Sequence, residues 1–266
     1  MKRASVVGVL LVLAAWPAAA QNDREPCFDR PGLGTPPCTV TPGKLVAELG
    51  LGDWTLDRTP DTRTDTVVVG DALARIGVAE HAEVRIGWTA FGHERERDRA
   101  TGAVDKSSGV GDVTLAVNRN LAHPDGSGTS VSVLPYVTVP TGGSTIGAGD
   151  WGTGVLIPAS FELSHAVALT LTPEIDAAVD QDRHGRHLAY GSVVGLSFSL
   201  SDAVSAGTEV QVIRDRDPVE HTTQELAGLS LGWQPGGDVQ LDAGTNLGLN
   251  HATPDVQVYL GVSRRF

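Results

Sequence analysis

The C-terminal stretch Val239–Phe266 reads VQLDAGTNLGLN, then HATPD, then VQVYLGVSRRF. In both longer parts, apolar residues alternate with polar or small ones, which is the side-chain period of a β-strand. The chain ends on an aromatic residue, Phe266. The stretch therefore predicts a hairpin of two long amphipathic strands. The polar or small face of this hairpin consists of Gln240, Asp242, Gly244, Asn246, Gly248, Gln257, Tyr259, Gly261 and Ser263.

The same alternation recurs from Lys44 onward, and no window keeps the 3.6-residue period of a helix. Each segment is near or above the roughly 9–11 residues that a tilted strand needs to cross a bilayer. Together with the C-terminal hairpin, these segments predict about twelve strands. The earlier segments are 44–54, 65–77, 82–92, 111–121, 129–140, 153–164, 166–180, 188–200, 203–214 and 222–233.

The connections between these segments alternate between short turns and longer, mostly charged loops. The longer ones are expected at 55–64, 93–110, 141–152, 180–187 and 215–221. Short periplasmic turns, longer outer loops and an even strand number are typical of a bacterial outer-membrane barrel. The alternative is a soluble β-sandwich, but its strands are usually about 5–6 residues long and need no polar inner face. The pattern thus favours an all-β, antiparallel, up-and-down transmembrane β-barrel over residues 44–266.

The N-terminus predicts export. Residues 1–20 combine Lys2 and Arg3, an apolar run and the small residues before Gln21, which is the pattern of a cleaved signal peptide. An uncleaved anchor is the alternative, but the apolar run is short for a spanning helix. Residues 21–43 are expected to form a periplasmic leader. Its cysteines, Cys27 and Cys38, predict a disulfide in an oxidising compartment, with two free thiols as the alternative.

Charge and aromatic content set further bounds. The formal net charge is −12, and removal of residues 1–20 takes away two basic residues and no acid, which gives −14. An acidic chain argues against nucleic acid as a partner. Aromatic residues make up only 5% of the chain, so any interfacial girdle is thin. We expect Trp54, Trp88, Phe91 and Trp151 near the outer ends of strands, and Trp233 and Phe266 near the inner ends.

Three stretches carry a resemblance to a known family. They are GVGDVTLAVNRNL at 109–121, LPYVTVPTGG at 134–143, and the C-terminal LDAGTNLGLNHATPDVQVYLGVSRRF. The chain resembles the outer-membrane transporter family that is labelled as the MetA-pathway phenol-degradation protein. The resemblance implies an outer-membrane barrel that takes up small aromatic or hydrophobic compounds, with no catalytic residues. Phe266 also resembles the signal that barrel-insertion machinery reads, although Arg264 departs from the apolar alternation there.

The strand period places a set of polar side chains on the inner face. By hypothesis they line the lumen, and because acids dominate, an open pore would favour cations. The alternative is a filled lumen in which these groups form hydrogen-bonded pairs, for instance Arg85 with a neighbouring Glu. The function is then a channel for small solutes, or a structural or adhesion-type barrel whose loops interact. The set is Glu48, Glu83, Arg85, Asp112, Glu162, Glu174, Asp176, Glu209, Asp242 and Asn246.

The sequence contains no phosphate-binding loop, HExxH or GxSxG motif. We therefore expect no enzyme, no cofactor and no metal, with membrane lipid, insertion machinery and a small solute as partners. His184 and His187 could meet His93 or His221 at the outer mouth in a metal site, but solvated loop histidines are the simpler interpretation. A lipid-facing Ser–His enzyme would need a partner for His165, and the sequence offers no obvious one.

Overall fold

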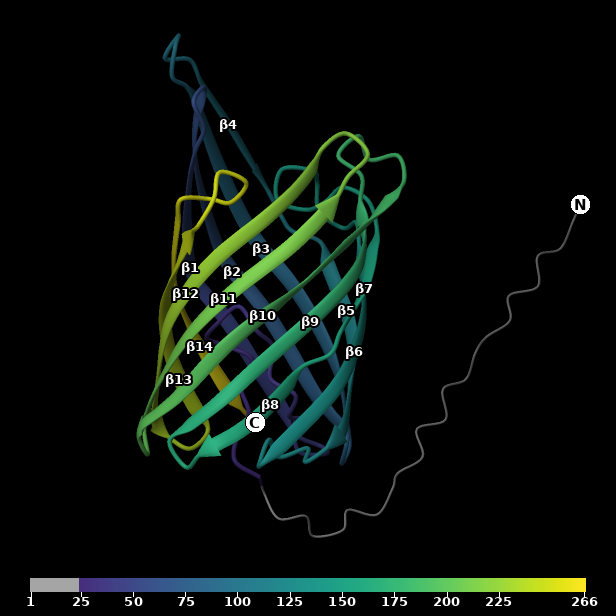
Figure 1. Ribbon diagram of the computed structural model, residues 1–266, viewed down its shortest axis with the longest axis vertical. Helices are drawn as coiled ribbons and strands as arrows, with labels where there is room; N and C mark the ends of the chain where they lie inside the picture. Colours follow the sequence, from purple (N-terminus) through teal and green to yellow (C-terminus); the bar gives the residue numbers. More distant parts are fainter. Residues whose placement is uncertain (1–23) are drawn as a thin grey trace, which may run out of the picture.

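The computed structural model describes residues 24–266; the expected signal peptide, residues 1–20, lies outside the described residues. These residues form a closed antiparallel β-barrel (Figure 1). None of them forms a helix that is long and apolar enough to cross a membrane. The fold class predicted from the strand period is confirmed.

Fourteen strand segments make twelve barrel strands, because β4 and β5 lie in turn beside β3, and β7 and β8 lie in turn beside β9. The segments are β1 (Leu45–Arg58), β2 (Thr62–Ala79), β3 (Ala82–Asp98), β4 (Val104–Gly109), β5 (Val113–Ala122), β6 (Thr129–Val139), β7 (Gly152–Leu156), β8 (Ala159–Ser164), β9 (Val167–Val179), β10 (Arg186–Ser201), β11 (Val204–Arg216), β12 (His221–Gly236), β13 (Val239–Gly248) and β14 (Val256–Arg265).

The C-terminal hairpin closes the cylinder. β13 pairs with β14, and β14 pairs antiparallel with β1, so that Leu49 lies opposite Val262. The backbone N–H of Phe266 donates to the carbonyl of Leu45 at 2.7 Å. Because the first and last strands pair along their length, the sheet has no free edge, which is the condition for a sheet to lie in lipid.

The barrel is apolar outside and polar inside. Side chains predicted to face outward are exposed, such as Leu241, Leu247 and Leu260, whereas Gln240 and Ser263 on the opposite face are buried. The one cluster of buried apolar residues is small, with Phe28, Val40 and Val46 as its members among residues 24–266. A soluble sandwich would bury its apolar rows instead, so the arrangement fits a lipid-facing wall.

The two ends of the barrel differ as the connections predicted. At the lower end of Figure 1, β10 and β11 are joined by two residues, Asp202 and Ala203, and the chain ends nearby. The loops 140–151, 180–185 and 217–220 lie at the opposite end. Following the general pattern of bacterial barrels, we take the short-turn end as periplasmic and the loop end as outer.

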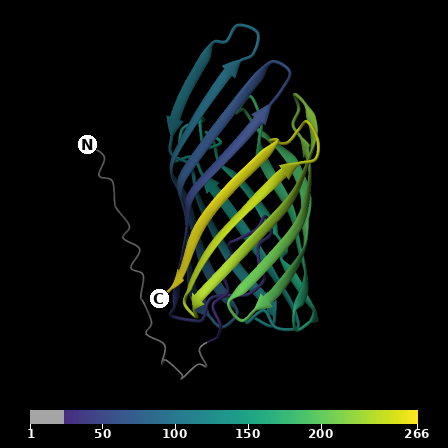
Figure 2. The same cartoon turned by 90° about the vertical axis from the view of Figure 1, so that its left-hand side faces the viewer.

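Two of the expected outer loops are wrong. Residues 55–64 and 93–110 are mostly strand: β1 and β2 extend until three residues join them, and β3 continues to Asp98, where it turns into β4. Both hairpins rise above the other strands (Figure 2). Their charges suit a solvated ladder, since Asp65 lies opposite Arg95 and hydrogen-bonds Arg63 at 3.0 Å. The charged residues in these two segments therefore indicate exposure to solvent, and they do not indicate a loop.

The expected strand 153–164 is also interrupted, at Ile157 and Pro158, because proline has no N–H for the ladder. The remaining groups keep the wall closed. The N–H of Ser132 donates to the Pro158 carbonyl at 2.8 Å, and that of Ile157 to the Pro173 carbonyl at 2.9 Å.

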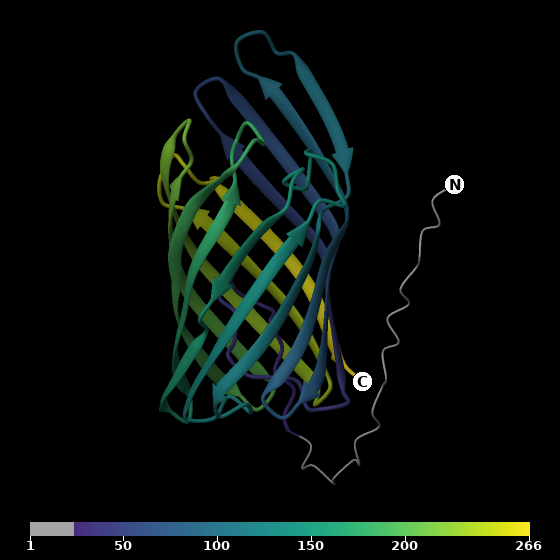
Figure 3. The same ribbon diagram turned by 90° about the vertical axis from the view of Figure 1, so that its right-hand side faces the viewer.

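The described part of the leader, residues 24–43, lies inside the lower half of the barrel (Figure 3). The sequence analysis placed this segment in the periplasm. The alternation of polar and apolar residues could not indicate a position inside the barrel, because the residues that bind this segment lie on strands far away in the sequence. The Cys27–Cys38 disulfide is present and closes a small loop within this segment. We call residues 24–43 the lumen loop.

Candidate functional site

The lumen loop is attached to the wall through Arg75. This guanidinium is fully buried and uses all five of its N–H donors. Its Nε and Nη2 bind Glu83 at 2.9 and 3.1 Å, and Nη1 binds Glu48 at 3.3 Å. Its other two donors reach the carbonyls of Cys27 at 2.6 Å and Cys38 at 3.3 Å. One wall residue thus holds both ends of the disulfide loop.

A second arginine extends this network. Arg85 binds Glu83 at 2.6 Å and Asp29 of the lumen loop at 2.8 Å. Two guanidinium groups therefore face three carboxylates. Backbone N–H groups supply the remaining donors, since those of Asp29 and Arg30 reach Glu48 at 2.8 Å. Buried charges persist only when they are paired and hydrogen-bonded in this way.

The lumen loop then contacts three further strands of the wall. Arg30 binds Asp242 on β13 at 3.0 Å, and the side chain of Asp242 is completely buried. Further along, the N–H groups of Leu33 and Gly34 donate to Glu209 on β11 at 2.6 and 3.0 Å. The N–H of Thr35 donates to the hydroxyl of Thr172 on β9 at 3.1 Å. The lumen loop therefore spans the interior of the barrel from β1–β3 to β9.

Two glycines of the barrel wall make room for the lumen loop. A Cβ at Gly261 would lie 2.3 Å from Nε of Arg30, and a Cβ at Gly77 would lie 2.3 Å from the carbonyl oxygen of Thr41. Both distances are shorter than real contacts allow. Glycine is therefore needed at both positions, because a larger residue would collide with the lumen loop.

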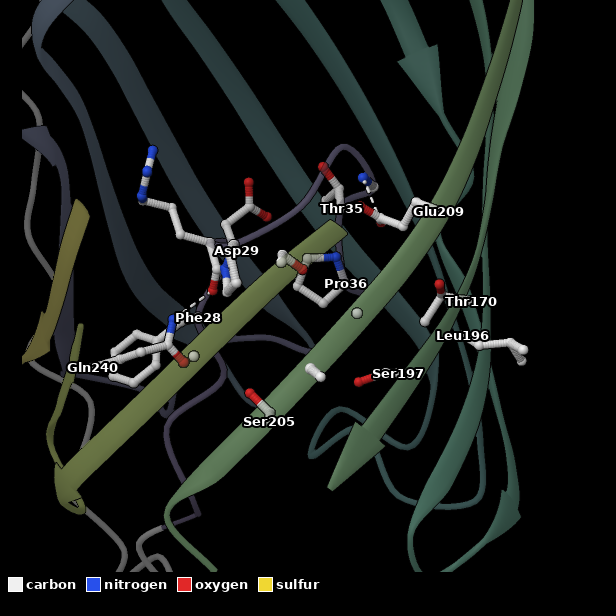
Figure 4. A pocket seen from close by; sticks show the side chains of 17 residues that line it. Phe28, Asp29, Thr35, Pro36, Thr170, Leu196, Ser197, Ser205, Glu209 and Gln240 are labelled. Atoms are coloured by element: carbon white, nitrogen blue, oxygen red, sulfur yellow. Dashed lines mark hydrogen bonds between the residues drawn. The ribbon is translucent and has the colours of Figure 1, made fainter. Parts of the chain in front are cut away.

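A cavity lies between the lumen loop and strands β9–β12. This cavity, of about 220 Å³, lies between Thr35 and Pro36 of the loop and Ser197 and Ser205 of the wall. Figure 4 shows Thr35 and Pro36 facing the strand that carries Glu209. Ser197 also lines a cavity of about 540 Å³ at the periplasmic mouth. The cavity beside the loop therefore borders the space at the lower opening.

Acidic side chains lie inside the barrel above the lumen loop. Asp176 accepts a hydrogen bond from the Tyr136 hydroxyl at 2.6 Å, and Glu174 precedes it on the same face of β9. Asp71 accepts one from Thr89 at 2.9 Å, and Asp53 one from Gln257 at 2.6 Å. The arginines described above lie lower, against the loop. The upper part of the barrel interior is thus acidic.

The remaining predicted residues occupy separate places. Asn246 is buried and donates to Gln257 at 2.7 Å. Asp112 accepts the N–H groups of Gly142 and Ala148 at 2.9 and 2.7 Å, and so fixes the loop 140–151 near the outer end. Glu162 is exposed at the periplasmic mouth, where it accepts the N–H of Gly128 at 3.1 Å.

The residues predicted for the inner face that contact the lumen loop fall into two groups. Glu48, Glu83 and Arg85 meet in one network, whereas Asp242 on β13 and Glu209 on β11 bind the lumen loop further along its course. Sequence reasoning missed Arg75, Asp29 and Arg30. Only a switch of strand face at Gly70, whose φ is +75°, could have indicated that Arg75 points inward.

Comparison with known proteins adds the family and the fold. A family model described as "Putative MetA-pathway of phenol degradation" matches residues 28–266. No curated protein matches the chain. A solved COG4313 outer membrane channel from Pseudomonas putida F1 is 14% identical, covers 89% of this chain and 99% of its own, and has a TM-score of 0.67.

Two porin structures are more distant. The KdgM porin in complex with disordered oligogalacturonate is 8% identical, with 84% of this chain and 99% of its own covered and a TM-score of 0.52. The NanC porin is also 8% identical, with 83% and 98% covered and a TM-score of 0.52. At these identities the likeness establishes a shared fold, which is that of outer-membrane channels and porins.

Proposed function

The chain belongs to the family described as "Putative MetA-pathway of phenol degradation", and on that premise we propose that it is an outer-membrane channel for small solutes. One observation carries the proposal: the lumen loop crosses a polar cylinder, and a cavity of about 220 Å³ remains between this loop and β9–β12, where we place the gap for a solute. A solute would pass the acidic upper lumen, then this gap, then the periplasmic mouth. The channel acts by passive permeation, without a catalytic step or a cofactor.

The negative charge of the upper lumen indicates which class of solute can pass. Glu174 and Asp176 face the upper lumen, so an anion entering from outside meets repulsion while a cation or a neutral molecule does not. A phenolic hydroxyl has an ordinary pKa of about 10 and is neutral at pH 7. Small neutral aromatic compounds therefore suit both the family description and the field of the lumen.

Phe266 has a separate proposed role. Its ring is exposed at the periplasmic end of the closing strand, and its N–H is bonded to the Leu45 carbonyl. We propose that this residue is read by barrel-insertion machinery before β14 meets β1. Membrane lipid then covers the outward apolar rows.

Planar-bilayer conductance tests the channel directly. We expect the wild type to pass current with a preference for cations, and the double variant Glu174→Gln/Asp176→Asn to pass current with a weaker preference, read as a smaller reversal potential in a salt gradient. The matched control is Asp105→Asn, an exposed carboxylate on the projecting β4, which should leave the reversal potential unchanged.

A second function has its own support. All five donors of the buried Arg75 are engaged, as expected for a lumen filled to hold shape. A barrel of this kind would display its outer hairpins for interaction and carry no current. Absence of current from folded wild-type protein would favour this structural or adhesion-type function over permeation.

A further inference from the structure

A histidine at the outer mouth is surrounded by carboxylates from neighbouring strands. His187 is the second residue of β10, Asp180 directly follows β9, and Asp217 directly follows β11. The side chains of His187, Asp180 and Asp217 are only 6%, 12% and 11% exposed. The three therefore converge in an enclosed position between two outer loops. Two histidines expected at this site have other partners: His93 is bonded to Ser108, and Nδ1 of His184 lies 2.7 Å from the carbonyl of Asp182.

The distances fit the first shell of a metal ion. Nδ1 of His187 lies 2.9 Å from Oδ1 of Asp180 and 3.4 Å from Oδ2 of Asp217. One ligand atom from each of the three residues lies within 4.8 Å of the others. Zinc bonds of roughly 2.0–2.2 Å in tetrahedral geometry place neighbouring ligand atoms about 3.4 Å apart. The pair of His187 and Asp217 already has this spacing, whereas the hydrogen-bonded pair of His187 and Asp180 would have to open by about 0.5 Å.

The other ring nitrogen gives independent support. Nε2 of His187 is buried and has no hydrogen bond, although Oδ1 of Asp215 lies 2.9 Å away. A metal on Nδ1 would leave the proton on Nε2, facing Asp215. Histidine ligands of metals usually donate their second N–H to a carboxylate in this manner. Asp215 is itself fixed, because Oδ1 also accepts the N–H of Asp217 at 2.9 Å.

The local charge also calls for a cation. Three carboxylates face one imidazole, so even a protonated ring leaves a net charge of about −2, which is costly in a largely enclosed position. The carboxylate of Asp217 also accepts the backbone N–H groups of Gln181 at 2.6 Å and of Val219 at 2.7 Å, which fix its position. Arg186, next to His187 in the chain, is engaged with Asp150 at 3.0 Å and with the ring of Trp151.

We propose that Asp180, His187 and Asp217 form a divalent metal site, with Asp215 as the carboxylate that orients the imidazole. One nitrogen and two carboxylate ligands suit Zn²⁺ better than Mg²⁺, which prefers oxygen ligands and octahedral geometry. The bound ion would tie the ends of β9, β10 and β11 together at the outer mouth. The site is separate from the lumen path and does not depend on conduction.

Zinc binding to the full chain tests the proposal. Protein without an affinity tag is stripped with a chelator in detergent and titrated with Zn²⁺ alone, by calorimetry and by metal analysis after dialysis. We expect one tight equivalent per chain. His187→Gln should weaken this binding at least tenfold, and Asp215→Asn should weaken it by about 10–100-fold.

The matched control is His184→Gln, the same chemical change at an exposed loop histidine whose Nδ1 lies 2.7 Å from the carbonyl of Asp182. It should bind Zn²⁺ as the wild type does. Each variant must first show the heat-dependent gel migration of a folded barrel. Failure of the wild type to retain zinc, or equal retention by His187→Gln, would overturn the site. Neither result bears on conductance, so the channel proposal stands or fails separately.

Discussion

Single residues determine whether charge can be buried inside this barrel. Arg75 is the clearest case, because its five donors all reach acceptors: Glu48 and Glu83 on the wall, and the carbonyls of Cys27 and Cys38 on the loop. Removing one member of a buried ion pair leaves its partners uncompensated, which typically costs about 3–5 kcal/mol. An exposed pair is typically worth less than about 1 kcal/mol.

We therefore expect Arg75→Met to lower the free energy of unfolding by about 3–5 kcal/mol, measured by urea titration of the barrel in lipid. The matched control is Arg58→Met. Arg58 pairs with Asp255 at 3.0 Å, but its side chain is 55% exposed, so this change should cost less than about 1 kcal/mol. Equal losses in the two variants would mean that the buried network does not stabilise the barrel.

Sequence reasoning reached part of this network. The two-residue period placed Glu48, Glu83 and Arg85 on the polar face of their strands, and the three side chains are buried and take part in the network around Arg75. It missed Arg75 because β2 changes face at Gly70. It also missed the pairing of Arg30 with Asp242, since contacts between residues so far apart in the chain leave no periodic signal.

At the scale of elements, the lumen loop depends on close approach to β14. The guanidinium of Arg30 lies against Gly261, where a Cβ would come within 2.3 Å of Nε. We expect Gly261→Ala to displace Arg30, to free Asp242, and to loosen the loop. The readout is proteolysis of the lumen loop in the folded barrel, which should become faster than in the wild type.

Gly52 on β1 provides the control, because a Cβ there would meet no atom within 4 Å. Gly52→Ala should leave the rate of loop cleavage unchanged. Loop cleavage that is as slow in Gly261→Ala as in the control would show that the close approach does not hold the loop in place.

The strands themselves were predicted well where one face meets lipid, because lipid enforces the alternation over the whole span. Prediction failed above the membrane, where β1–β2 and β3–β4 continue as charged hairpins in water. In these hairpins, backbone hydrogen bonds and pairs of opposite charges between strands hold the strands together, and no face of apolar residues is needed. The same lack of signal hid the course of residues 24–43, which form no strand.

For the whole molecule, the governing feature is the outward apolar surface. Leu260 lies in the middle of β14, is 49% exposed, and has Gly52 and Ala243 as its ladder partners. A basic side chain at the bilayer midplane of a barrel costs about 2–4 kcal/mol. We therefore expect Leu260→Arg to make folding into lipid less favourable by this amount.

Val104→Arg is the control, since Val104 begins β4 on the projecting hairpin and is 40% exposed. It should change folding little, because its surroundings are aqueous. Folding is followed on gels of unboiled samples, where a closed barrel migrates differently from the denatured chain. A cost for Val104→Arg as large as that for Leu260→Arg would contradict the placement of lipid around the cylinder.

The central claim is that the lumen loop narrows the path through the barrel without closing it. The most direct test is single-channel conductance in planar bilayers of the wild type and of a variant in which residues 24–43 are deleted, each first shown to be folded. We predict discrete current steps from the wild type and larger steps from the deletion variant. Equal step sizes in the two proteins, or no current from either, would contradict the claim.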